Sequence, residues 1–430
     1  MNRFSHRKAG WQIFEINKRR RTDGKNFDTN GEIGQSKKFD LPVVTFTASK
    51  ADKANDDERI KSKVVNINSS GDDTALVDSL MKHSESLVDV NACNLIAFSG
   101  GIDSSLTAKL VHETFHNMSN TSRTDNQFES VDDSDLSSRK GSVTAVIGIS
   151  PSLAKRQLKL AQSIASSIQI PLTEVLTSEG TNETYIENNG KACFVCKTHL
   201  YQALEAVAKN AKDISQSIKE GNVSQDVILY NGTNADDTQD PTRLGLIAAQ
   251  EFSVKSPLIH ITKEEVRRAA RHLGLENWDY AASPCLRSRL ELGVEATKNH
   301  LQAVQLAEEY IRQELKLGTD VNFRVRMLTK QRAMLELDVR WLVQWNELSS
   351  SAIQVDDFIR DEEDDCIDNN EVRSAKVLDF LKHRGVEEYF QKLGFYGGLG
   401  IRAFKSGSVA NLLGKNIHHM SKTSIEAMMP

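Results

Sequence analysis

The chain has 430 residues, with 54 Lys or Arg and 59 Asp or Glu, and its formal net charge is −5. This mildly acidic total argues against binding nucleic acid over the whole surface, and no apolar run approaches the roughly 20 residues that cross a bilayer. Five cysteines in so long a chain do not make a secreted disulfide framework. We therefore expect a cytoplasmic protein with no nucleic-acid or membrane partner.

The N-terminal region is polar and lacks sustained hydrophobic periodicity. Residues 1–38 contain ten Lys or Arg and four acids, with "KRRR" at 18–21. We predict a largely disordered basic extension over residues 1–85. No apolar segment of a secretory signal follows the first Met, and targeting to an organelle by the basic N-terminus is the alternative to a cytoplasmic location.

The region 86–290 alternates strand-like and helix-like segments. The predicted strands are "NLIAF" (94–98), "VTAVIGI" (143–149), "LTEVLT" (172–177), "VILYNG" (227–232) and "FSVKSPL" (252–258). The predicted helices lie at 104–115, 153–168, 197–211 and 263–274, the last behind a Thr262–Glu265 capping box. This alternation predicts an α/β fold: a Rossmann-like parallel sheet with helices on both faces.

A smaller C-terminal α+β domain is predicted at 291–415, followed by a tail at 416–430. It begins with a helical pattern at 296–315 and continues with a hairpin of two alternating strands at 321–339. Two polar segments interrupt the pattern, an insertion at 117–141 and an acidic one at 350–372. Residues 355–371 alone carry nine acids and one Arg, which is typical of a disordered loop.

A Ser-Gly-Gly turn follows the first strand of the predicted sheet. A strand that ends in such a turn and opens into a helix surrounds a concavity with backbone N–H groups, which favours a phosphate. The chain lacks the G-x-x-x-x-G-K-[ST] sequence of a Walker loop. The loop instead resembles the SGGxDS pyrophosphate loop of N-type ATP pyrophosphatases, through Ser99, Gly100, Gly101, Asp103 and Ser104. The resemblance implies ATP and Mg²⁺ as ligands, cleavage between the α- and β-phosphates, and a catalytic role for Asp103.

Three cysteines form a second candidate site. Cys193 and Cys196 make a C-x-x-C pair, and Cys285 follows in "AASPCLRSRL". A closed zinc site needs a fourth ligand, for which His199 is a candidate, whereas three Cys on a 4Fe–4S cluster leave one iron open. A redox-active C-x-x-C and simple buried thiols are the other interpretations that the spacing allows.

Several longer segments resemble LarE-type ATP-dependent sulfur transferases, which act in nickel-pincer nucleotide synthesis. They are "YIENNGKACFVCK", "YNGTNADDTQDPTRLGL", "KSPL", "AASPCLRSR", "NFRVR" and "LGFYGGLGIRAFKSGS". The resemblance implies adenylation of a carboxylate of a pyridinium mononucleotide, then replacement of AMP by sulfur. It implies a sulfur source of one of two kinds: Cys285 itself, or a sulfide donor that delivers hydrosulfide to a 4Fe–4S cluster on Cys193, Cys196 and Cys285. The resemblance favours the cluster, and we expect a small-molecule nucleotide substrate and a homo-oligomer.

The segment "NFRVR" places two arginines two residues apart on a strand, so that they share a face. Arg324 and Arg326 would repel unless an anion lay between them, and Arg suits bidentate phosphate recognition. The resemblance assigns them to the substrate phosphate, places Ser288 and Arg289 in the substrate pocket, and matches Glu308 to an acid near the site. An exposed polar strand face is the alternative interpretation for the two arginines.

A polar cluster follows the strand at 227–232. Asn234, Asp236 and Asp237 there are suited to bind Mg²⁺ through water, or to hydrogen-bond a ribose or a substrate amine. An ordinary polar turn is the alternative. Two other enzyme classes with the same pyrophosphate loop stay open. They are a tRNA thiolase with an iron–sulfur cluster, and an amide-forming ligase resembling NAD, GMP or asparagine synthetase.

Overall fold

The structure is a computed structural model. It describes residues 43–45, 71–124, 141–218, 226–240, 243–352 and 369–405. The predictions for residues 1–42 and 46–70 of the basic extension, for most of both polar insertions, for Cys366 and for the tail at 416–430 therefore lie outside the described residues. Within these ranges, no helix is long and apolar enough to cross a membrane.

The larger sheet has five strands in the order β1-β4-β3-β2-β5. Four of them are parallel, and the short edge strand β1 pairs with β4 in the antiparallel sense. In a parallel sheet the carboxyl ends of neighbouring strands lie at one edge, where ligands bind in open α/β sheets. The bounds are β1 Val43–Thr45, β2 Cys93–Ala97, β3 Ser142–Ile149, β4 Leu172–Leu176 and β5 Val227–Tyr230.

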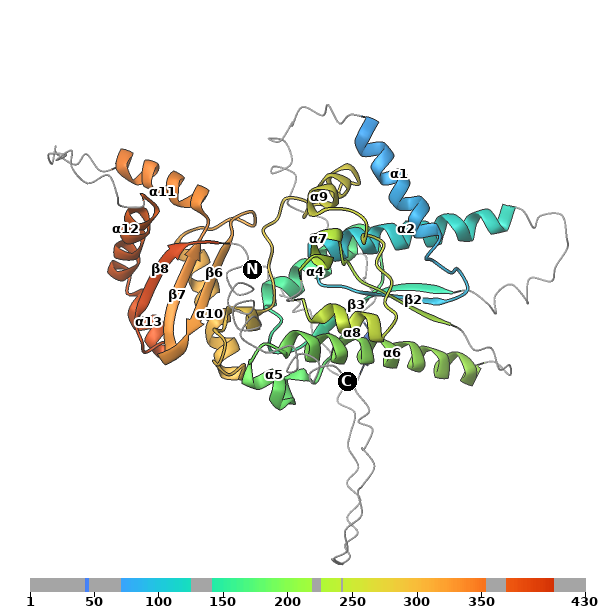
Figure 1. Ribbon diagram of the computed structural model, residues 1–430, viewed down its shortest axis with the longest axis horizontal. Coiled ribbons are helices and arrows are strands. Elements are labelled where there is room, and N and C mark those ends of the chain that lie inside the picture. Colours follow the sequence, from blue (N-terminus) through green and yellow to red (C-terminus); the bar gives the residue numbers. More distant parts are fainter. Residues whose placement is uncertain are drawn as a thin grey trace, which may run out of the picture. The chain divides into compact units, whose positions relative to one another are not determined.

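Alternation along the strands supplies a hydrophobic core on each face of this sheet. Ile96 packs into the core formed with α1, α2, α4 and α9, while Leu95 packs into the core formed with α6 and α8. Figure 1 shows these two groups of helices on opposite sides of the strands. The predicted Rossmann-like layer is confirmed. The helices and turns of this region are α1 Gly71–Glu85, α2 Ile102–Thr124, α4 Lys155–Ile168, η2 Glu179–Thr181, α5 Glu183–Glu187, α6 Ala192–Ile218, α7 Ala235–Thr238, α8 Gly245–Glu251 and α9 Lys263–His272.

The second sheet has three strands in the order β6-β7-β8. The predicted hairpin is confirmed by the antiparallel pairing of β6 with β7, and β8, which we did not predict, adds parallel to β7. Helix α10 packs Leu301, Val304 and Ile311 into the same core. The smaller α+β part is thus confirmed. Its elements are η3 Leu286–Arg289, α10 Lys298–Glu314, β6 Phe323–Leu328, η4 Thr329–Gln331, β7 Arg332–Leu337, α11 Val339–Ala352, α12 Asn369–His383, α13 Val386–Lys392 and β8 Leu399–Ala403.

The predicted strand at 252–258 is wrong. Ser253 has a φ of 50°, which ends helix α8, and only Lys255 forms a bridge, to Tyr230 of β5. Pro257 then removes the next N–H donor, so no ladder develops.

Two other expectations fail at their boundaries. Helix α1 occupies Gly71–Glu85, within the stretch that we expected to be disordered. Helix α2 continues to Thr124, into the stretch that we took as a polar insertion. Helix α1 is ordered because Val77 and Leu80 are buried against the core and because Asp72 and Asp73 form ion pairs with Arg268 of α9.

The Asp73 contact predicts a pH dependence of stability. The hydrogen bond from Arg268 lowers the pKa of Asp73 below its usual value. A carboxylate with a lowered pKa in the folded state stabilises the protein above its unfolded pKa, and this contribution disappears as the pH falls through the folded pKa. We expect Asp73→Asn to lower the melting temperature at neutral pH and to lose that difference from the wild type as the pH falls from about 5 toward 3.

Melting temperatures measured by circular dichroism over this pH range check the expectation. Asp78→Asn is the matched control, since Asp78 is exposed on the same helix. An Asp73→Asn variant that follows the wild-type curve at every pH would show that the ion pair does not hold α1.

Candidate functional site

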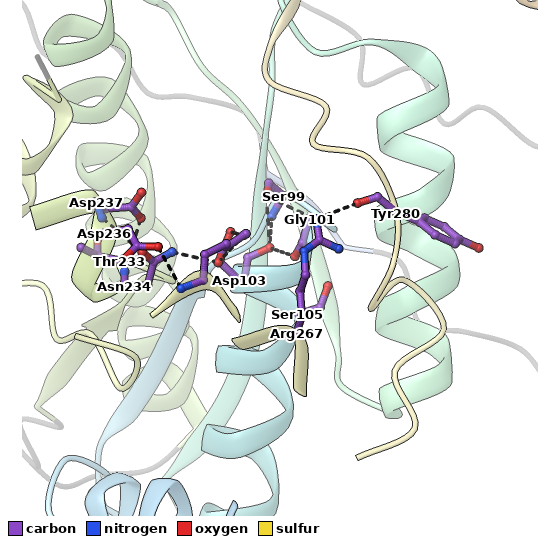
Figure 2. A network of polar contacts seen from close by, with 12 residues as sticks. Ser99, Gly101, Asp103, Ser105, Thr233, Asn234, Asp236, Asp237, Arg267 and Tyr280 are labelled. Atoms are coloured by element: carbon purple, nitrogen blue, oxygen red, sulfur yellow. Dashed lines mark hydrogen bonds and ion pairs between the residues drawn. The ribbon is translucent and has the colours of Figure 1, made fainter. Parts of the chain in front are cut away.

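The loop between β2 and α2 forms a tight, internally bonded turn at the carboxyl edge of the larger sheet (Figure 2). Ser104 Oγ accepts from the Ser99 N–H at 3.2 Å and donates to the Gly101 carbonyl at 2.9 Å. Gly100 has a φ of 70°, and a Cβ there would lie 2.6 Å from Ala161 Cα. Glycine is therefore required at this position for both its backbone angle and its lack of a side chain.

Two buried amides hold the carbonyl groups of this loop. Gln157 Nε2 of α4 donates to the Ser99 carbonyl at 2.5 Å, and Asn277 Nδ2 donates to the Gly100 carbonyl at 2.9 Å. With its carbonyls bound to the protein, the turn has a fixed orientation at the start of α2, where the helix dipole favours an anion. The loop that the sequence singled out is thus built in a way that suits a phosphate.

Asp103 binds a lysine that sequence reasoning missed. Lys263 Nζ of α9 donates to both carboxylate oxygens of Asp103, at 2.6 Å and 2.5 Å, and Asn234 Nδ2 donates to Oδ1 at 3.1 Å. The capping box of α9, which we did predict, places Lys263 at the first helical position. An acid and a lysine thus lie together at the loop, and Figure 2 shows Asp103 pointing toward Asn234.

The polar cluster after β5 is largely engaged in local structure. Asn234 and Asp237 form a reciprocal capping box at the start of α7, and Asp236 accepts the Lys263 N–H at 3.0 Å. Burial raises the pKa of Asp237, while Arg243, whose guanidinium is 2.8 Å away, opposes that rise. These contacts place the cluster beside Asp103, and Mg²⁺ or substrate binding by the three residues stays a prediction.

The three cysteines lie on two segments, near two cations. Cys193 and Cys196 are in the first turns of α6, and Cys285 directly precedes η3. Arg287 donates to Cys193 Sγ at 3.0 Å, and Lys197 interacts electrostatically with all three thiols. Burial, followed by the nearby Glu179 and Cys285, raises the pKa of the half-buried Cys196 to about 12.

The described side chains around the three cysteines form no site for a single metal ion. Among the described residues, no group of three or more His, Cys, Asp or Glu is arranged to hold a metal ion. Cys193 and Cys285 are exposed, and His199, our candidate fourth zinc ligand, hydrogen-bonds Ser178 Oγ at 3.0 Å. The donor set suits an iron–sulfur cluster chemically, and Cys196 interacts electrostatically with both Cys193 and Cys285, so a cluster on these three thiols stays a prediction.

Arg289 fixes the segment that carries Cys285. It is buried, pairs with Glu308 Oε1 at 2.8 Å, and donates to the Pro284 carbonyl at 2.5 Å and the Cys285 carbonyl at 3.2 Å. Ser288 Oγ also donates to the Cys285 carbonyl, at 2.7 Å. The two residues that we placed in a substrate pocket therefore hold the Cys285 backbone in position.

Arg324 and Arg326 are buried, so the alternative of an exposed polar strand face is wrong. β6 lies in the middle of a hydrophobic core, and its arginines bind partners there. Arg326 pairs with Glu336 at 2.7 Å and donates to the Ser288 carbonyl at 2.8 Å. Arg324 lies 4.7 Å from the centre of the Phe404 ring and donates weakly to the Ala282 carbonyl, at 3.4 Å.

The electrostatics distinguish the two arginines. Burial, reinforced by the neighbouring Arg289, lowers the pKa of Arg324 to about 9. Among the described side chains, no carboxylate forms an ion pair with Arg324. Arg324 is thus a buried cation without a direct counter-ion, which is the arrangement that an incoming anion would complete.

A pocket lies beside this group, between the start of α4, the segment 280–283 and α10. Arg156 and Arg312 line it together with Arg289 and Glu308. Burial and the neighbouring Arg156 lower the pKa of Arg312 to about 10. Sequence reasoning missed Arg156 and Arg312, since each occupies an ordinary position of an amphipathic helix and only the fold brings them together.

The chain resembles two known proteins, and no family model matches it. The uncharacterized protein slr1717 of Synechocystis sp. is 33% identical over 258 residues, which cover 58% of this chain and 78% of that protein. The pyridinium-3,5-bisthiocarboxylic acid mononucleotide synthase of Lactiplantibacillus plantarum is 26% identical over 220 residues, covering 50% of this chain and 66% of that enzyme. The chain therefore belongs to the same family as the Synechocystis protein, and the Lactiplantibacillus synthase is its distant homologue.

Proposed function

We propose that this protein is an ATP-dependent sulfur transferase. It would adenylate a carboxylate of a pyridinium mononucleotide, release pyrophosphate and replace AMP with sulfur. The observation that carries the proposal is the loop from Ser99 to Ser104 with Asp103 and Lys263 at its mouth. The distant homology to the pyridinium-3,5-bisthiocarboxylic acid mononucleotide synthase supports the choice of acceptor.

The loop and its neighbours would bind the polyphosphate of ATP. Backbone N–H groups at the start of α2 and the Lys263 ammonium supply positive potential where negative charge develops on the leaving pyrophosphate. Mg²⁺ would bind the phosphates together with Asp103, whose carboxylate faces the same space as Lys263. With Mg²⁺ on the carboxylate, Lys263 would be available to the phosphates.

The acceptor nucleotide would bind on the side of the buried arginines. Its phosphate would pair directly with Arg324, with which no described carboxylate forms an ion pair, while Arg326 stays paired with Glu336. The pocket lined by Arg156 and Arg312 also includes Arg289, a charged neighbour of Arg324, and would hold the carboxylated ring.

Sulfur transfer would use Cys285, which is exposed and held by its backbone. Its thiolate attacks the acyl carbonyl, AMP leaves, and a thioester forms. Removal of the Cys285 Cα proton by a base then breaks the Cβ–S bond. The products are the thiocarboxylate and dehydroalanine at position 285, so that each chain turns over once.

Asp103→Asn tests the proposed ATP site. We expect pyrophosphate release in the presence of the acceptor nucleotide to fall by roughly a hundredfold or more, because the variant loses both the metal ligand and the partner of Lys263. The matched control is Asp226→Asn, which alters an exposed aspartate at the opposite end of the larger sheet. Pyrophosphate release at the wild-type rate in Asp103→Asn would remove the loop from the mechanism.

Arg324→Ala tests the proposed phosphate contact. Because a charge-assisted hydrogen bond contributes about 1.5–3 kcal/mol, we expect about ten- to a hundredfold weaker acceptor binding, with ATP binding unchanged. Arg326→Ala serves as the comparison, since it leaves Glu336 with Arg402 alone and should lower the melting temperature. Calorimetric titration with the acceptor nucleotide and with ATP measures the two affinities, and thermal unfolding measures the melting temperature. An equal loss of ATP affinity in Arg324→Ala would contradict the assignment.

The sulfur source is tested by mass spectrometry of the intact chain after a single turnover. We expect the wild type to lose the elements of H₂S and the dehydroalanine to map to position 285. Cys285→Ser should still release pyrophosphate but form no thiocarboxylate. Sustained turnover with an unchanged chain mass would instead show that sulfur comes from an external donor.

A further inference from the structure

Helix α2 carries the sequence His-Glu-Thr-Phe-His at residues 112–116. His112 and His116 are four residues apart, so they lie on the same face of the helix, one turn from each other. This spacing places two imidazoles toward one metal ion on helices that bind zinc. The proposed ATP site uses neither residue.

The two imidazoles converge in the structure. Their Nε2 atoms are 3.1 Å apart, and the ring centres are 4.5 Å apart at an angle of 74°. At about 2.0–2.1 Å from a metal ion, two nitrogens are roughly 2.9 Å apart in octahedral geometry and roughly 3.4 Å apart in tetrahedral geometry. The observed separation lies between these two values, so one ion can reach both atoms with small ring rotations.

A metal ion can take the place of the hydrogen bond between the two rings, in which the donor and the acceptor depend on the tautomers. In a hydrogen bond between two Nε2 atoms one ring must accept, and an imidazolium has no lone pair to do so. The ring that donates can carry its proton on Nδ1 instead, which frees the second Nε2 lone pair for a metal ion.

The helix holds the pair at the protein surface. Thr114 and Phe115, between the two histidines, are buried, which fixes the opposite face of α2 against the core. The Phe115 ring also packs edge-on against the His116 ring at 5.6 Å. His112 is half-buried and His116 is exposed, so water can fill the remaining coordination positions.

We propose that His112 and His116 bind one divalent transition-metal ion of the Ni²⁺, Cu²⁺ and Zn²⁺ class through their Nε2 atoms. Imidazole suits these ions, whereas Mg²⁺ and Ca²⁺ prefer oxygen ligands. The Glu113 carboxylate pairs with Lys109 at 2.8 Å, and no third protein ligand completes the site among the described residues. The site is therefore open and exchangeable, unlike a closed structural zinc site.

Titration of the purified full chain with Ni²⁺ and Zn²⁺, followed by calorimetry, tests this proposal. We expect His116→Ala to lose one bound equivalent, or to bind it at least about tenfold more weakly, because half of the protein ligands are gone. Since the thiols bind the same ions, the diagnostic quantity is the difference between the wild type and the variant. Mg²⁺ should give no such difference.

Two further variants make the result decisive. His83→Ala is the matched control, since the His83 ring faces His260 with ring centres 5.5 Å apart, and it should keep the equivalent. His112→Ala should lose it, and saturating Zn²⁺ should raise the melting temperature of the wild type but not of His116→Ala. Indistinguishable titrations of the wild type and His116→Ala would overturn the proposal, and so would loss of the equivalent in His83→Ala alone. Neither outcome bears on ATP-dependent sulfur transfer.

Discussion

The ion pair between Asp103 and Lys263 joins the parts from which the ATP site is built. Asp103 lies in the first turn of α2, Lys263 begins α9, and Asn234, which also donates to Asp103, caps the N-terminus of α7. The starts of α2 and α7 lie together because β2 and β5 are parallel neighbours, so that the loops after them leave the same edge of the sheet. The parallel bridge of Lys255 to Tyr230 brings the segment that leads into α9 to the same edge. A Cβ on Gly232 would lie 2.6 Å from the Asp103 carbonyl carbon, which shows how closely the two loops pack. Any shift in strand register would separate the acid from the lysine.

The parts of the fold that could be predicted from the sequence are those set by local patterns, and contacts between distant segments explain the rest. Buried parallel strands are short apolar runs between helical stretches, and β2, β3, β4 and β5 were recognisable in this way. The segment 252–258 has the same composition, but the positive φ of Ser253 and the missing N–H of Pro257 stop it from pairing. Helix α1 escaped notice because its order comes from a contact with α9 almost 200 residues later, which no local pattern encodes.

In the candidate site, too, the features set by local sequence were predictable, and those set by tertiary contacts were not. The pyrophosphate loop was predictable because its requirement is local: glycine at a left-handed backbone angle beside a helix start. Lys263, Arg156 and Arg312 were not, because their roles depend on which helices the fold brings together. The Arg324–Arg326 pair was found by its two-residue spacing, but its burial was not, since alternation along β6 is hidden by the side chains that cover both of its faces.

In the smaller part of the protein, some buried charges are explained by the stability of the fold, and one is better explained by a bound ligand. Arg326, Arg402 and the buried Glu336 form a group in which each cation contacts a carboxylate, and such a group can be explained by stability alone. Arg324 differs, because no described carboxylate forms an ion pair with it. The cost of its burial is offset by a long carbonyl contact, an aromatic ring and the more distant attraction of Glu308 and Glu336. Replacing it with an apolar residue would remove that cost, so the contacts among the described residues do not by themselves give a reason for an arginine at this position. An anion bound beside it would supply one, since the attraction between opposite charges is strongest where water is excluded.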